Sequence, residues 1–154
     1  MDNITFSLVP IGKVGEDQGS PAVIVEERFR PALQELELFS HVIVVWWSDK
    51  YFEGCEYMRL GEYLAAETEY SKGHVMGIFA TRSPVRPNPV CISVARIEGV
   101  RRDAGTVRLG GIDAFAGSPV IDLKPYYPCL DRAQSVRVPS YVPDWGEWCT
   151  ESQP

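Results

Sequence analysis

Short runs of apolar and β-branched residues recur along the whole chain, and this pattern limits the folds that the chain can adopt. Such runs, separated by Gly, Pro and polar residues, are typical of strands that pair in an antiparallel sheet or a closed barrel. The sequence therefore predicts a mainly β fold, a small closed or nearly closed antiparallel β-barrel with one or two short helices. The predicted strands lie within Ile4–Val14, Ala22–Val25, Ser40–Trp47, Val75–Ala80, Cys91–Val100, Thr106–Ile112 and Pro119–Leu123.

The run Ser40–Trp47 is apolar almost throughout, which is typical of a strand buried on both faces. A helix is predicted just before this strand. Pro31 suits a first helical position, and Leu33, Leu36 and Leu38 follow at near-helical spacing. The sequence thus predicts a helix that leads into a buried strand.

A chain of 154 residues is long enough to bury one core and short for two domains. Residues 1–138 are predicted to form the barrel domain. Residues 139–154 are rich in Pro, Trp and acidic residues, and we expect an irregular tail that packs on or beside the barrel through Trp145 and Trp148. The stretch Glu56–Ala66 has only partial helical spacing, so its structure stays open.

The longest apolar run, Val42–Trp47, is too short to cross a bilayer, and the N-terminus lacks a basic stretch followed by an apolar one. The sequence therefore predicts a soluble, cytoplasmic protein with no membrane partner. The four cysteines form no Cys-x-x-Cys pair, and the chain has only two histidines. No metal site is predicted, and the cysteines are expected to be reduced thiols.

Charge is unevenly distributed along the chain. The net charge of −6 argues against broad, non-specific binding of nucleic acid, which depends on phosphate neutralisation. The window Met76–Arg102 departs from this average, because it holds five arginines and a single acid, Glu98. The sequence therefore leaves room for a local basic site in an acidic protein.

The segment Gly77–Ser93 combines rigidity with polar side chains. Its three prolines fix the backbone at closely spaced positions, and a stiff loop loses less entropy when it binds a ligand. Guanidinium groups on such a loop suit a carboxylate or a phosphate. The alternative is a surface turn whose arginines face water or pair with acids. The polar residues of the loop are Thr81, Arg82, Ser83, Arg86 and Asn88.

A second unusual segment, Gly110–Pro128, places single acids among apolar and glycine residues. A buried acid is costly unless it is paired, so Asp113 and Asp122 need partners. The arginines of the first segment and Lys124 are the obvious ones. Asp122 and Lys124 lie two residues apart on one strand, so a plain ion pair between them is an equally good interpretation.

The two segments together carry a family resemblance. The motif FATRSPVRPNP followed by IDAFAGSPVIDLKPYYP resembles the signature of the TsaA-like family, and LELFSHVIVVWW resembles its helix-to-strand junction. The resemblance spans about Ile4–Asp131. It implies an S-adenosylmethionine-dependent methyltransferase that acts on N6 of threonylcarbamoyladenosine beside the tRNA anticodon. It also implies a small β-barrel and a homodimer with the cofactor near the subunit interface.

The resemblance further implies roles for individual residues. Gln18 stands where the family has a Pro-Arg-Gln segment, and Asp49 and Lys50 replace its His-Gln pair. The other positions that match cofactor contacts of the family are Arg82, Ile92, Ile112, Asp113, Ala114 and Phe115. Further motif positions, expected to bind the acceptor or support the loop, are Arg86, Asn88, Asp122, Lys124 and Tyr126.

Methyl transfer from a sulfonium is an in-line displacement, so the protein mainly supplies alignment and a polar-lined slot. Arg86, Asn88 and Lys124 are predicted to bind an anionic acceptor such as tRNA. If the acceptor nitrogen must lose a proton, Asp122 or Tyr126 is the predicted catalytic base. Two alternatives remain: a methyltransferase acting on another nucleoside or a small metabolite, and a non-catalytic module that binds a small molecule.

Overall fold

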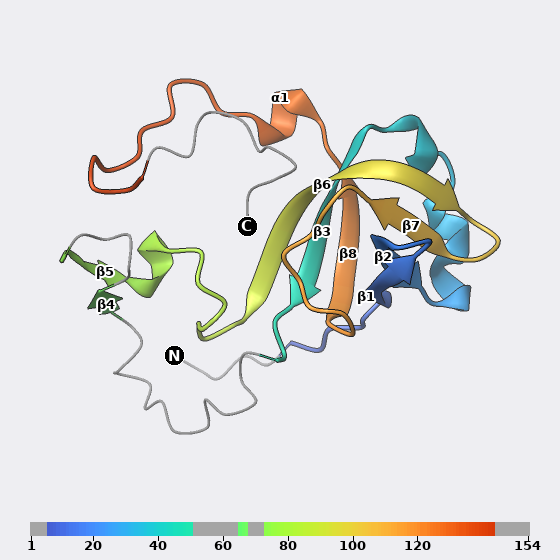
Figure 1. Ribbon diagram of the computed structural model, residues 1–154, viewed down its shortest axis with the longest axis horizontal. Coiled ribbons are helices and arrows are strands. Elements are labelled where there is room, and N and C mark those ends of the chain that lie inside the picture. The colour runs from blue at the N-terminus through green and yellow to red at the C-terminus, as the bar shows by residue number, and fades with distance from the viewer. Residues whose placement is uncertain (1–5, 51–64, 68–72, 144–154) are drawn as a thin grey trace.

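The computed structural model describes residues 6–50, 65–67 and 73–143. Six antiparallel strands in the order β1-β2-β7-β6-β3-β8 close into a ring, because β8 pairs with β1 through Val120 and Gly12 (Figure 1). This ring confirms the predicted mainly β, closed antiparallel fold. Its strands are β1 (Gly12–Asp17), β2 (Ser20–Val25), β3 (His41–Trp47), β6 (Val90–Arg101), β7 (Thr106–Leu109) and β8 (Pro119–Pro125).

The inward faces of the strands form the core. Along β3, Val42, Val44 and Trp46 are buried, and the residues between them are only half-buried. The prediction that β3 is buried on both faces is therefore wrong. The apolar residues of its second face lie on the outside of the closed sheet, away from the core.

The helix predicted from Pro31 consists of two 3-10 segments, η1 (Glu27–Leu33) and η2 (Leu36–Leu38). Pro31 lies inside η1 rather than at its start, where its missing N–H group would matter least. Glu35 then adopts a left-handed conformation with φ of 65°, which separates the two segments. The one α-helix among the described residues is α1 (Pro128–Asp131).

A small two-stranded sheet of β4 (Ala65–Glu67) and β5 (Val75–Gly77) lies apart from the ring, at the left in Figure 1. The 3-10 segment η3 (Ile78–Ala80) follows it, so the predicted run at 75–80 is only half strand. The ring of Tyr141 stacks on His74, with centroids 4.4 Å apart. Trp145, Trp148 and most of Glu56–Ala66 lie outside the described residues.

The antiparallel order gathers several connections at one end of the ring, which we call the loop end. It holds the turn between β1 and β2, the residues after β3, the segment 81–89 before β6 and the connection 110–118 between β7 and β8. The opposite end carries η1 and η2, which connect β2 to β3. Among the described residues, no helix is long and apolar enough to span a membrane.

Candidate functional site

The proline-rich segment before β6 is braced by its own side chains. Thr81 Oγ1 donates to the Ile78 carbonyl at 2.9 Å and accepts from the Ser83 amide at 3.2 Å. Ser83 Oγ in turn accepts from the Val85 amide at 3.2 Å. These local bonds act together with the prolines to fix the loop. Thr81 and Ser83, two of the polar residues of this loop, thus support the loop itself.

The two arginines of this loop bind carbonyl groups rather than acids. Arg82 Nη2 donates to the Ile92 carbonyl at 2.8 Å, and Arg86 Nη1 donates to the Thr81 carbonyl at 3.4 Å. Neither forms an ion pair with a described residue, so the pairing with acids in their alternative interpretation is not seen, whereas the exposure of Arg82 agrees with the other half of it, an arginine that faces water. Asn88 contributes its carbonyl to the Val90 amide, and the residue is exposed.

Five other cations among the described residues behave differently, because carboxylates neutralise them. The ion pairs join Arg28 to Glu26, Arg101 to Asp17, Arg102 to Glu37, Arg108 to Glu98 and Lys124 to Asp122. No described carboxylate neutralises Arg82 or Arg86, so their positive charge is available to an anionic ligand.

The connection after β7 approaches the start of β6 at the loop end. Ser93 Oγ donates to Asp113 Oδ1 and accepts from Trp46 Nε1 at 3.0 Å. Ile112 and Ala114 pack against the core, whereas Phe115 is 48 % exposed. This segment therefore combines an anchored carboxylate with an exposed aromatic ring.

Asp49 and Lys50 follow β3 at the same end. Lys50 Nζ donates to the Ala116 carbonyl. Gly117 lies beside this ammonium group with φ of 93°, and an added Cβ would stand 3.3 Å from Lys50 Nζ. Asp49 Oδ1 is buried and makes no hydrogen bond with a described residue, and the same holds for the hydroxyls of Ser48 and Ser118. Buried polar atoms without partners are rare and suit a site that takes up polar groups.

Cys91 was missed as a site residue, because a lone thiol carries no sequence signal beyond its position after the Pro-Asn-Pro motif. It is half-buried at the start of β6. Burial raises the pKa of this thiol, and the Asp113 carboxylate raises it further, while Arg86 and Arg82 oppose the shift. These four side chains thus share one electrostatic environment. The thiol stays protonated at neutral pH, which disfavours a nucleophilic role.

Gln18 lies in a left-handed conformation in the turn between β1 and β2. Its side-chain oxygen accepts from Arg108 Nη1 at 2.9 Å, and Arg108 is also paired with Glu98. Gln18 is therefore at the loop end, but its contact runs toward β7 rather than toward Arg82.

The predicted catalytic residues lie on or just after β8. Lys124 Nζ is 2.7 Å from Asp122 Oδ2, and this hydrogen bond and charge raise the pKa of Lys124. Asp122 Oδ1 also accepts from the Leu123 amide at 2.9 Å. Asp122 thus takes part in the ion pair that was its alternative interpretation. In the sheet it faces Val45, which faces Ile92 on the next strand.

Tyr126 lies farther from the loop end. Its amide donates to the His41 carbonyl at 3.1 Å, where β3 begins. The structure therefore places Asp122 two strands away from Ile92, with β3 between them. It places Tyr126 toward the end covered by η1 and η2.

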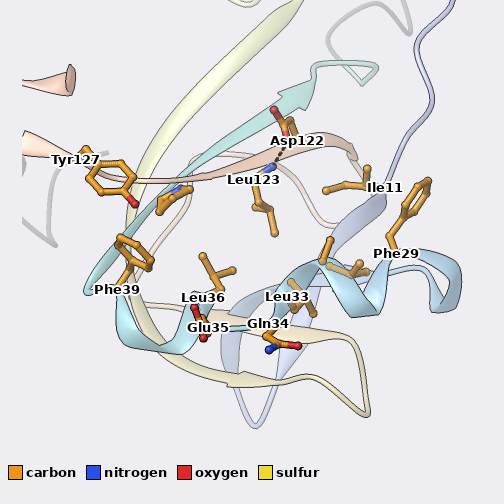
Figure 2. A pocket seen from close by; sticks show the side chains of 13 residues that line it. Ile11, Phe29, Leu33, Gln34, Glu35, Leu36, Phe39, Asp122, Leu123 and Tyr127 are labelled. Carbon is orange, nitrogen blue, oxygen red and sulfur yellow. Dashed lines mark hydrogen bonds between the residues drawn. The ribbon is translucent and has the colours of Figure 1, made fainter.

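A cavity of about 400 Å³ also lies at that opposite end. Figure 2 shows Phe39 and Tyr127 on one side of it and Phe29 on the other, with leucines between them. Its lining is mostly apolar, and Asp122 is at its edge. The polar groups at the loop end thus form a separate cluster: Asp49, Lys50, Arg82, Arg86, Cys91, Ser93 and Asp113.

The sequence profile described as tRNA-methyltransferase O N-terminal domain matches residues 6–132, which include the ring and the whole cluster. The chain belongs to the tRNA-methyltransferase O family. This confirms the resemblance to the TsaA-like family.

Relatives in the tRNA-methyltransferase O family include proteins named for their ligand. A probable S-adenosyl-L-methionine-binding protein from Pyrococcus abyssi is 34 % identical over 130 residues, which cover 84 % of this chain and 65 % of that protein. A tRNA (adenine(37)-N6)-methyltransferase from Eikenella corrodens is 47 % identical over 69 residues, which cover 44 % of this chain and 38 % of the relative.

The crystal structure of TrmO from Pseudomonas aeruginosa has the same fold, with a TM-score of 0.63 and 28 % identity. The match covers 87 % of this chain and 62 % of that chain. The chain thus spans a little less than two thirds of the Pyrococcus abyssi and Pseudomonas aeruginosa proteins, and the match to the Eikenella corrodens protein covers 38 % of that relative.

Proposed function

We propose that the chain binds S-adenosylmethionine at the loop end and transfers its methyl group to N6 of threonylcarbamoyladenosine beside the tRNA anticodon. The observation that carries the proposal is the cluster itself. A rigid loop presents two arginines that no described carboxylate pairs with, beside an anchored aspartate and buried polar atoms that have no hydrogen-bond partner among the described residues. The family relatives named for S-adenosylmethionine binding and for tRNA adenine methylation support it.

The donor and acceptor groups of the cluster fit this cofactor. Its ribose hydroxyls and its amino groups are hydrogen-bond donors, which suit the unpartnered Asp49 Oδ1 and the Asp113 carboxylate. Its carboxylate suits the Arg82 guanidinium, which is exposed and close to the start of β6. Ile92, Ile112, Ala114 and Phe115 would supply apolar contacts, and Gln18 and Lys50 would complete the site.

The acceptor would carry negative charge on its phosphates and on the threonylcarbamoyl carboxylate. Arg86 binds only a backbone carbonyl among the described residues, so its charge is available to such an acceptor. Asn88 and Lys124 remain proposed acceptor contacts, and Lys124 would have to share its charge with Asp122.

When bound, the cofactor supplies an activated methyl group, so the residues of this chain mainly orient two reactants and exclude water. Arg82 would bind the carboxylate of the cofactor, and Asp113 would accept hydrogen bonds that fix the orientation of the cofactor in the site. Asp122 remains the proposed base for the acceptor N6 proton, with Tyr126 as the second proposed base.

A homodimer belongs to the same proposal. The outer face of β6 carries exposed apolar side chains, with Val90 at 38 %, Ile92 at 48 % and Val94 at 41 % exposure. They pair in register with Trp47, Val45 and Ile43 of β3, so the two strands form a continuous apolar surface. Pairing of two copies through this surface would bring Ile92, and with it the cofactor site, to the subunit interface.

Calorimetric titration with S-adenosylmethionine and with its demethylated product tests the cofactor. Methyl transfer is then measured with radiolabelled cofactor on tRNA that carries threonylcarbamoyladenosine, on tRNA that lacks it, and on the free nucleoside. The proposal expects cofactor binding and label only in the modified tRNA. Binding without transfer to any acceptor would identify a binding module, and label in the free nucleoside would identify a different substrate. Absence of cofactor binding would refute the proposal.

A further inference from the structure

Ser93 joins two elements of the ring through one hydroxyl group. Trp46 on β3 is 3 % exposed, and its Nε1 donates to Ser93 Oγ on β6 at 3.0 Å. Ser93 Oγ then donates to Asp113 Oδ1 in the connection between β7 and β8. The three side chains therefore form a continuous hydrogen-bonded chain from the core to the loop end.

The chemistry of the three groups fixes which group donates and which accepts in each of the two hydrogen bonds. An indole N–H can only donate, and an ionised carboxylate can only accept. The middle group must therefore accept one hydrogen bond and donate another, which a hydroxyl does and an alkyl group cannot. The buried indole sets the orientation of the hydroxyl, and the hydroxyl sets the orientation of the carboxylate.

We propose that Ser93 is a positioning residue that, with Trp46, holds the Asp113 carboxylate in the orientation that binds the cofactor. The inference rests on the proposed function, because it assumes that Asp113 contacts the cofactor. The Asp113 residue is exposed, and without this anchor its side chain would sample several rotamers. Holding it in advance lowers the entropy lost when a ligand binds.

The electrostatics of β6 agree with this placement. Cys91 lies two residues before Ser93 on the same strand, and the Asp113 carboxylate is close enough to raise the pKa of the Cys91 thiol. The carboxylate thus lies close to the start of β6.

The test measures S-adenosylmethionine affinity by calorimetry for Ser93→Ala, Ser93→Thr, Asp113→Ala and the Ser93→Ala/Asp113→Ala double variant. Ser40→Ala is the matched control, because this hydroxyl lies at the other end of β3, where it bonds to His41. We expect Ser93→Ala to weaken binding about tenfold, as for a lost hydrogen bond to a charged group. Ser93→Thr, which keeps the hydroxyl, and the control should bind as the unchanged protein does.

The double variant decides whether Ser93 acts through Asp113. We expect it to bind no more weakly than Asp113→Ala alone, because the positioned group is already gone. Equal affinity of Ser93→Ala and the unchanged protein, or additive losses in the double variant, would overturn the inference. If the unchanged protein does not bind the cofactor, the proposed function fails instead.

A second measurement needs no variant at Ser93. The indole N–H cross-peak of Trp46 is assigned by its loss in Trp46→Phe. It reports on the end of the hydrogen-bonded series Trp46–Ser93–Asp113 that is remote from the ligand. We expect it to shift as S-adenosylmethionine is added, with a midpoint at the calorimetric Kd. A cross-peak that does not move while the cofactor binds would contradict the proposed connection.

Discussion

Replacement of Arg82 by alanine tests the proposed cofactor site with little risk to the fold. The Arg82 side chain is exposed, and its one hydrogen bond to a described residue goes to the Ile92 carbonyl at 2.8 Å. Loss of such a bond costs about 1 kcal/mol of unfolding free energy. For a domain of this size we expect the midpoint of thermal unfolding to fall by only about 2–4 °C.

The effect on cofactor affinity should be much larger. A guanidinium that pairs with a carboxylate beneath a bound ligand contributes about 2–4 kcal/mol when one partner is removed. That loss corresponds to a Kd about 30- to 1,000-fold higher. Calorimetric titration of Arg82→Ala with S-adenosylmethionine and with its demethylated product measures this directly. Both ligands keep the carboxylate, so both should lose affinity to a similar degree.

Two further variants separate charge from geometry. Arg82→Lys keeps the charge and loses the planar fork, so its Kd should lie between those of the unchanged protein and Arg82→Ala. Arg28→Ala removes an exposed arginine of η1, at the opposite end of the ring, that pairs with Glu26. This variant should bind the cofactor as the unchanged protein does. Unchanged affinity in Arg82→Ala, with the fold intact, would refute the assignment of Arg82 to the cofactor.

Other residues give shorter predictions. Leu109→Ala removes a fully buried side chain and should lower the free energy of unfolding by about 2–5 kcal/mol in urea titration; a loss below about 1 kcal/mol would contradict the described core. Iodoacetamide at pH 8 should modify exposed Cys129 before half-buried Cys91, as followed by peptide mass spectrometry, because burial raises the pKa of Cys91 and keeps it protonated. Because the pKa of the Cys91 thiol is raised in the folded protein, the folded state loses stability as the pH rises above 9.0, the ordinary pKa of this thiol. The free energy of unfolding of Cys91→Ala should therefore depend less on pH in that range. Val94→Glu places a charge in the apolar outer face of β3 and β6, and light scattering after gel filtration should then report a monomer, whereas we expect the unchanged protein to be a dimer.

The strands of the ring were predictable because the residues of each strand show a strand pattern by themselves. Runs such as Val42–Trp47 combine β-branched residues with flanking turn residues, and the structure places a strand within or across each of the other predicted runs of the ring. The prediction for Ile4–Val14 was wrong in its bounds, because β1 begins only at Gly12 and continues to Asp17. The pairing order was not predictable in the same way. The contact of β8 with both β1 and β3 depends on closure of the whole sheet. Leucine spacing after Pro31 also misled, because a proline inside the segment and a left-handed Glu35 favour 3-10 turns.

The candidate site divides in the same manner. The motif residues Arg82 and Asp113 were found because they lie in unusual sequence, and the fold brings both to the loop end. Ser93 was not found, since a serine within a strand has no local signal of a bridging role. The unpartnered Asp49 Oδ1 and the environment of Cys91 were equally hidden, because burial and electrostatic contact arise only when β3, β6 and the loops meet.

An acidic protein can recognise an anion when unpaired positive charges lie together at one place, even though the net charge is negative. In the described part of this ring, Asp17, Glu26, Glu37, Glu98 and Asp122 neutralise cations away from the proline-rich loop. Arg82, Arg86 and Lys50 instead bind carbonyl dipoles, which orient the cations without cancelling their charge. The net charge of the chain is negative and disfavours indiscriminate binding to nucleic acid, while the loop end keeps three cations that no described carboxylate pairs with. Such sorting favours an acceptor that first fits the loop end by shape and only then gains from charge.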